Sequence, residues 1–104
     1  MFKALMKMIG YRPTDFAGLL ENGAVIIDVR TRSEFNAGHI KGSVNIPLNL
    51  LEANLKKLDK SKPVITCCAS GMRSASARSI LKAKGYEVFN GGSWDALALK
   101  LKRK

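Results

Sequence analysis

Residues 63–74 read Pro-Val-Ile-Thr-Cys-Cys-Ala-Ser-Gly-Met-Arg-Ser, and this stretch decides the fold. It opens on an apolar run that is typical of a strand covered on both faces. Pro63 stands only at the first position, where a strand tolerates proline. A turn with a glycine and then a helical pattern over residues 74–84 follow directly. A buried strand that passes through a short turn into a helix is the building unit of a parallel α/β sheet.

Strand and helix patterns alternate on both sides of this stretch. Further apolar runs predict strands at residues 24–29, 43–46 and 86–89, the last closed by Gly91 and Gly92. Helical patterns lie at residues 14–20, 31–38, 48–58 and 93–101. This alternation predicts an α/β fold with a central parallel β-sheet and α-helices on both faces.

The predicted helices carry recognisable end signals. Thr14 and Ser93 are candidate N-caps, and Thr31 and Glu34 have the spacing of a capping box. Gly38 is expected to end the second helix in a left-handed turn. These local signals fix where the helices should begin and end.

Length and composition indicate one domain of 104 residues with a formal net charge of +10. Two cysteines are too few for a disulfide scaffold or a four-cysteine zinc site, and there is one histidine. No apolar run approaches the roughly 20 residues that span a bilayer. Basic segments without interleaved aromatic residues give no sign of a nucleic-acid platform. We therefore expect no metal, no membrane and no nucleic-acid partner.

The N-terminus is apolar and basic over residues 1–9, interrupted by Lys3 and Lys7. It has no small-residue cleavage site, so we interpret it as an N-terminal extension or a short amphipathic helix rather than a signal peptide. The domain itself is expected over residues 10–104. Two free cysteines and no export signal predict a cytoplasmic protein.

The turn after the cysteine pair has the composition of an anion-binding nucleophile site. Cys68 ends the strand, and backbone N–H groups in a tight strand-to-helix turn, with the first turn of the helix, can face a thiolate. Gly71 gives the backbone freedom there, and Arg73 supplies a permanent forked cation. Cys68 is thus the candidate nucleophile.

Several motifs stand in the order found in rhodanese-like domains, which this chain resembles over roughly residues 10–98. They are Asp28-Val-Arg30, Glu34-Phe35, Gly38-His-Ile40, Gly42-Ser-Val-Asn-Ile-Pro47, Cys68-x-x-Gly-x-Arg-Ser74 and Gly91-Gly92.

The resemblance implies a rhodanese-like fold and sulfurtransferase chemistry on Cys68. The thiolate would take a sulfane sulfur from a small anionic donor such as thiosulfate, or from a persulfide donor, and become a cysteine persulfide. The sulfur would then pass to cyanide or to a thiol acceptor, including one on a partner protein. No cofactor is needed. The loop residues that would hold the substrate are Ala69, Ser70, Gly71, Met72 and Arg73.

Three alternatives stay open beside this enzyme. One is a protein-to-protein persulfide carrier, and another is a non-enzymatic interaction or sensory module. The third is a cysteine-dependent phosphatase, which is disfavoured because its loop places five residues between cysteine and arginine. Here four residues separate Cys68 from Arg73. The loop residues between them are uncharged, so the choice between thiosulfate and persulfide donors is open.

Neighbouring polar and thiol groups are interpreted structurally. Cys67 is expected to be a buried thiol on the opposite face of the strand from Cys68. His39 is expected to hydrogen-bond the backbone in a turn, and Asp28 and Arg30 to form an ion pair that fixes the loops.

Overall fold

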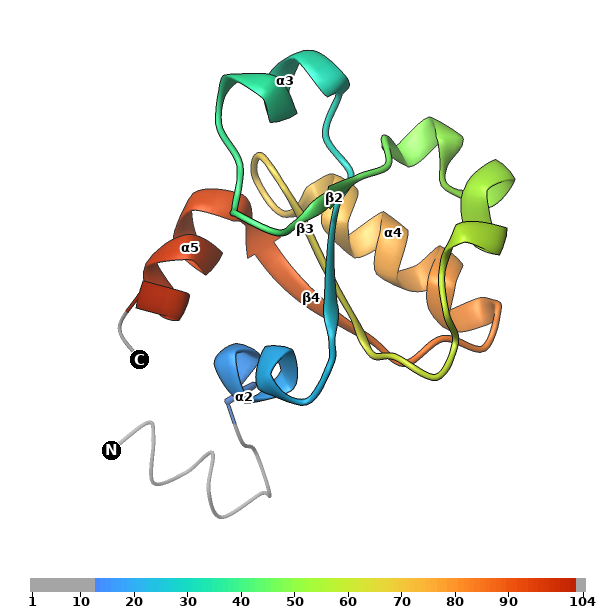
Figure 1. Ribbon diagram of the computed structural model, residues 1–104. Helices are drawn as coiled ribbons and strands as arrows, with labels where there is room; N and C mark the ends of the chain where they lie inside the picture. Colours follow the sequence, from blue (N-terminus) through green and yellow to red (C-terminus); the bar gives the residue numbers. More distant parts are fainter. Residues whose placement is uncertain (1–12, 103–104) are drawn as a thin grey trace.

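The computed structural model describes residues 13–102, in which four parallel strands form one sheet in the order β2-β1-β3-β4 (Figure 1). The strands are β1 (Val25–Asp28), β2 (Val44–Asn45), β3 (Val64–Cys68) and β4 (Val88–Ser93). The α-helices are α2 (Phe16–Glu21), α3 (Arg32–Ala37), α4 (Met72–Ala83) and α5 (Trp94–Lys102). The segments η1 (Leu48–Leu50) and η2 (Glu52–Lys57) are 3₁₀ helices. The predicted α/β class and parallel sheet are confirmed.

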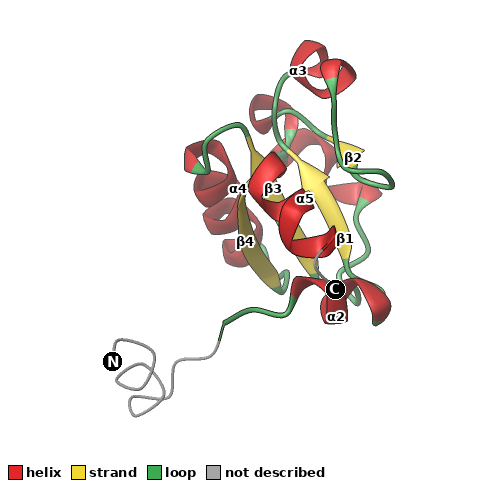
Figure 2. Ribbon diagram, turned by 90° about the vertical axis from the view of Figure 1, so that its left-hand side faces the viewer, coloured by secondary structure: helices red, strands yellow, loops and turns green. Residues whose placement is uncertain are grey.

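Two apolar layers cover the two faces of the sheet (Figure 2). On one face α4, η1 and η2 pack over Ile27, Val64 and Leu51. On the other face α2 and α5 pack over Ile26 and Ile65. Because side chains alternate along a strand, β1 and β3 supply both layers, which is why both read as continuous apolar runs. Helices on both faces were predicted and are present.

The strand β4 is longer than its sequence pattern suggested. The prediction closed this strand at Gly91 and Gly92, but the structure continues it through both glycines to Ser93. A Cβ on Gly91 would lie 2.7 Å from the backbone oxygen of Thr66, so only glycine lets β4 approach β3 here. The register between β3 and β4 shifts at this point, between Thr66 and Cys68.

The structure confirms some of the predicted helix-end signals and contradicts others. The capping box of Thr31 and Glu34 on α3 is confirmed. The N-cap of α2 is Asp15 rather than Thr14, because the Asp15 carboxylate accepts the Gly18 N–H at 3.0 Å. Gly38 does not adopt the predicted left-handed conformation, since its φ of 164° is extended backbone.

The leucine-rich stretch over residues 48–58 was predicted as one helix and forms the two short segments η1 and η2. Leu51 between them is fully buried, and Leu48, Leu55 and Leu58 pack against the same core layer. Apolar side chains three or four residues apart suit both helix types, so the spacing did not separate them.

No helix in the described part of the chain is long and apolar enough to cross a bilayer. The predicted N-terminal extension or amphipathic helix over residues 1–9 lies outside the described residues.

Candidate active site

Cys68 lies at the carboxyl end of β3, where the chain turns through residues 69–71 into α4. Its Sγ accepts the N–H of Gly71 at 2.9 Å and the N–H of Ser74 at 3.2 Å. Gly71 has φ 102°, a left-handed conformation that glycine adopts without strain. That conformation lets two main-chain N–H groups point at one sulfur, as in the anion-binding turns of other proteins.

A buried polar group holds the first turn of α4 in place. The Ser74 hydroxyl donates to Asn90 Oδ1 at 2.6 Å and lies 2.8 Å from the Thr66 hydroxyl. Asn90 Oδ1 also accepts the Gly92 N–H at 2.9 Å. Ser74 is therefore fixed by β3 and β4 while its own N–H faces the Cys68 sulfur.

Arg73 forms a bidentate ion pair with Glu34 of α3. Nη1 donates to Oε1 at 2.8 Å and Nη2 to Oε2 at 3.0 Å. This guanidinium, followed by the Thr31 N–H, lowers the pKa of the Glu34 carboxyl to about 2. Glu34 thus serves both the capping box of α3 and the cation beside the reactive loop. The sequence predicted Arg73 as a cation near the thiol. The structure adds its partner, Glu34, which fixes the position of the guanidinium.

A second ion pair anchors α3 from the end of β1. The Asp28 carboxylate and the Arg30 guanidinium are buried and paired at 2.7 Å. Arg30 also donates to the backbone oxygens of Gly38 and Glu34 at 2.7 and 3.2 Å, and lies 4.6 Å above the ring of Trp94. The predicted structural role of this pair is confirmed. It holds the segment that carries Glu34 toward Arg73.

Cys67 faces the opposite side of the sheet, as predicted. It belongs to the apolar layer with Leu97 of α5 and Ile26 of β1. Burial, followed by the nearby Asp28 carboxylate, raises the pKa of the Cys67 thiol to about 12. The side chain is thus a neutral packing group at physiological pH.

The remaining loop residues are on the surface. Ala69 and Ser70 are exposed on the turn, and Met72 is 79% exposed at the start of α4. The donors to Cys68 are Gly71 and Ser74 rather than the whole run from Ala69 to Arg73. Of the residues that the sequence analysis did not assign to the site, Ser74 was visible in the loop motif and Glu34 in the capping box. Asn90 carried no sequence signal.

His39 makes a local contact away from the reactive sulfur. Its Nδ1 lies 2.8 Å from the Phe35 backbone oxygen and its ring stacks on Phe35 at 3.7 Å. The predicted backbone contact in the turn is confirmed. Among residues 13–102 no group of three His, Cys, Asp or Glu side chains is placed to hold a metal ion.

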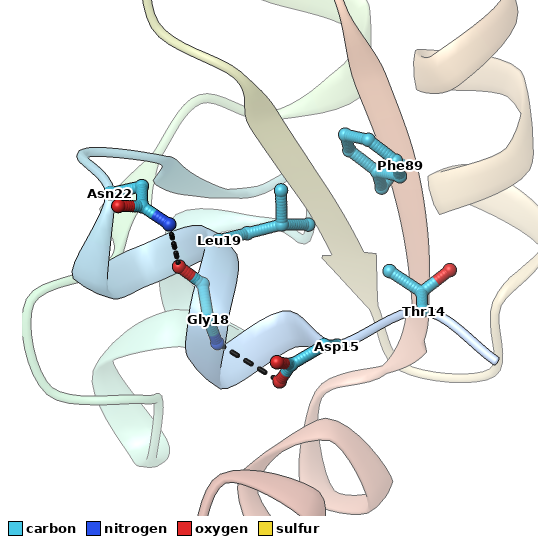
Figure 3. Close-up of a pocket in the computed structure, with 6 residues that line it drawn as sticks. All are labelled: Thr14, Asp15, Gly18, Leu19, Asn22 and Phe89. Carbon is cyan, nitrogen blue, oxygen red and sulfur yellow. Dashed lines mark hydrogen bonds between the residues drawn. The ribbon is translucent and has the colours of Figure 1, made fainter.

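A shallow hollow lies between α2 and Phe89, which is near the amino end of β4 (Figure 3). It is lined by Thr14, Asp15, Gly18, Leu19, Asn22 and Phe89. Its main polar side chains are used by the helix itself, because Asp15 accepts the Gly18 N–H and Asn22 donates to the Gly18 oxygen. No cysteine or histidine lines it.

Comparison with known proteins identifies a family. Residues 12–98 match the rhodanese-like domain family. The uncharacterized protein YqhL of Bacillus subtilis is 40% identical over 68 residues, covering 64% of this chain and 54% of that protein. The chain therefore spans about half the length of this relative.

The chain covers a larger share of two other similar proteins. The thiosulfate sulfurtransferase GlpE of Pseudomonas savastanoi pv. phaseolicola is 34% identical over 74 residues, covering 71% of this chain and 70% of that protein. The crystal structure of a rhodanese-related protein from Thermoplasma volcanium has a TM-score of 0.71 and 32% identity, covering 86% of this chain and 92% of that chain.

Proposed function

This chain belongs to the rhodanese-like domain family, and from that premise we propose that it is a sulfurtransferase whose Cys68 carries the transferred sulfur. The observation that carries the proposal is the Cys68 Sγ, which accepts two backbone N–H groups at a strand-to-helix turn. Relatives named as thiosulfate sulfurtransferases support the reaction class.

In the proposed reaction the Cys68 thiolate attacks the outer sulfur of thiosulfate or of an organic persulfide. The S–S bond of the donor breaks, and sulfite or a thiolate leaves with its electron pair. Cys68 then holds a persulfide, which the N–H groups of Gly71 and Ser74 stabilise as they do the thiolate. An acceptor thiolate or cyanide takes the outer sulfur and returns the Cys68 thiolate, so the cycle balances without a cofactor.

The loop residues have distinct proposed roles. The amides of Ala69 and Ser70 and the side chain of Met72 border the mouth through which the donor arrives, and the Gly71 amide holds the sulfur. Arg73 orients the first turn of α4 through its bidentate pair with Glu34. The site is proposed to work in the cytoplasm, on a small donor and a thiol acceptor.

A persulfide carrier that delivers sulfur to another protein is the second candidate. The observation that favours it is Met72, a large apolar side chain left 79% exposed immediately after the loop. A partner protein docked over the reactive turn would cover this side chain. A carrier would form the Cys68 persulfide and turn over slowly with small acceptors.

Intact mass measurement tests the proposal. The protein is incubated in turn with thiosulfate, cysteine persulfide and glutathione persulfide, and the gain of one sulfur atom is located by peptide mapping. We expect the sulfur on Cys68 in the wild type and in Cys67→Ser, and none in Cys68→Ser. Sulfur transfer by folded Cys68→Ser, or sulfur mapped to Cys67, would overturn the assignment.

A further inference from the structure

A cleft of about 330 Å³ opens beside the reactive loop, on the same side of the sheet as Cys68. It is lined by Val29, Thr31, Pro47, Leu48, Asn49 and Arg73. Of these residues, Arg73 alone was predicted to hold substrate. The sulfur-transfer steps described above leave this cleft without a role.

The cleft adjoins the segment that carries the sulfur site. The Val29 N–H bonds the Cys67 oxygen at 2.9 Å, and the Leu48 N–H bonds the Val29 oxygen at 3.1 Å, which ties the cleft floor to the end of β3. Val29, Leu48 and Cys68 pack in one apolar layer. Arg73 of α4 forms the shared wall, because it follows the Cys68 loop directly and also lines the cleft. A molecule seated here would therefore contact Arg73, five residues after Cys68.

The lining chemistry selects an organic molecule. Val29, Pro47 and Leu48 make an apolar floor, while Thr31, Asn49 and Arg73 form the polar rim. Glu34 neutralises the Arg73 charge, and within residues 13–102 the Asn49 side chain makes no hydrogen bond. With its cation paired and an amide free, the cleft suits an uncharged aliphatic stem with a hydrogen-bonding group better than an inorganic dianion.

We propose that this cleft binds the organic stem of an aliphatic thiol acceptor. Binding there brings the acceptor's thiol group to the Cys68 persulfide. The proposal rests on the proposed function. The acceptor thiolate attacks the outer sulfur, a new S–S bond forms on the acceptor, and the bond between the two sulfurs at Cys68 breaks. Its electron pair returns to Cys68 as the thiolate, and the acceptor leaves as a persulfide.

The test compares two acceptors that share a thiol and a hydroxyl group and differ in stem length. Cys68 persulfide is prepared in the full chain, and its loss to 2-mercaptoethanol and to 6-mercaptohexanol is followed by intact mass. Each buried methylene favours binding roughly fourfold, so we expect the longer thiol to react at least about tenfold faster. Equal rates for the two thiols in the wild type would overturn the proposal.

Two variants on the same 3₁₀ turn locate the effect. Asn49→Trp fills the cleft from an exposed rim position and should abolish the preference for the longer thiol. Leu50→Trp is the matched control, because Leu50 is 45% exposed and does not line the cleft, and it should keep the wild-type ratio. A misfolded variant loses both rates, whereas a filled cleft loses only the preference. A preference that survives in Asn49→Trp would overturn the proposal.

Cyanide separates this proposal from the function on which it rests. It has no organic stem, so release of sulfur to cyanide reports the Cys68 chemistry alone. Sulfur release to cyanide without any thiol preference would overturn the cleft assignment and leave the sulfurtransferase standing. Failure to form a persulfide with any donor would overturn both.

Discussion

The two adjacent cysteines have no solvent exposure, yet they lie in opposite environments. Cys67 packs in the apolar layer beneath α5, where burial disfavours the charged form of the thiol. Cys68 lies beneath the turn over residues 69–71, of which Ala69 and Ser70 are exposed, and faces two N–H donors. Burial alone therefore says little about the reactivity of a thiol. What matters is whether main-chain donors or hydrocarbon surround the sulfur, and how much structure must move to expose it.

The largest expected effect is a difference in alkylation between the two thiols. Iodoacetamide at pH 8 should label Cys68 in the native protein, because only the turn over residues 69–71 must move aside. Cys67 should stay unlabelled, because its pKa of about 12 leaves roughly one part in ten thousand as thiolate and α5 covers it.

Peptide mapping after timed labelling measures the two rates in one sample. A denatured sample, in which both thiols react, is the control. Comparable native rates for Cys67 and Cys68 would contradict the contrast between the two faces.

The next largest effect concerns the ion pair that anchors α3 near the Cys68 loop. Asp28→Ala leaves the Arg30 guanidinium buried without its partner, and breaking a buried pair costs about 3–5 kcal/mol. Urea unfolding measures this loss. The double variant Asp28→Ala with Arg30→Met removes both charges and should recover part of it. A single variant as stable as the wild type would show that the pair does not hold this region.

A smaller loss of stability is expected from overpacking the face of the sheet on which Cys67 lies. In Gly91→Ala the new Cβ would lie 2.7 Å from the Thr66 oxygen and 2.9 Å from Leu97 Cδ2. Such overpacking costs roughly 1–3 kcal/mol. Ser70→Ala on the exposed turn should change stability by less than about 0.5 kcal/mol. Thermal unfolding of the two variants measures both losses of stability. Equal losses in Gly91→Ala and Ser70→Ala would contradict the difference between the packed face and the exposed turn.

The smallest expected effect is the acid sensitivity of the pair between Glu34 and Arg73. Folding lowers the Glu34 pKa from its usual 4.5 to about 2. The carboxylate therefore contributes its stability fully above about pH 4.5 and loses it as the pH falls toward 2. Both side chains are partly exposed, so the effect should be smaller than that of Gly91→Ala.

Urea midpoints at pH 7 and pH 3 measure this difference. The wild type should lose more stability on acidification than Glu34→Gln, which has no carboxylate to protonate at this position. Identical acid losses in the two proteins would show that the pair has no influence on folding.

The sequence predicted the features that depend on neighbours in the chain. The strand, glycine turn and helix around Cys68 and the capping box of Thr31 and Glu34 were identified because their partners lie within a few residues. Contacts between distant segments were missed. The bidentate bond from Arg73 to Glu34 and the buried bond from Ser74 to Asn90 depend on tertiary structure. The passage of β4 through Gly91 was missed because the sequence does not show that β3 lies close enough to require glycine.

The parallel pairing of β1 with β3 also constrains how the chain folds. Val25 lies opposite Val64, so this central pairing must close a long loop before the sheet exists, and such non-local closure slows folding. The two donors to Cys68 come from residues at most six positions further along the chain. We therefore expect the turn over residues 69–71 to form early in folding, together with α4. The ion pair between Arg73 and Glu34 of α3 should form only when the sheet closes. In a chain still being synthesised, the N–H bonds to Cys68 would then form before the active site is complete.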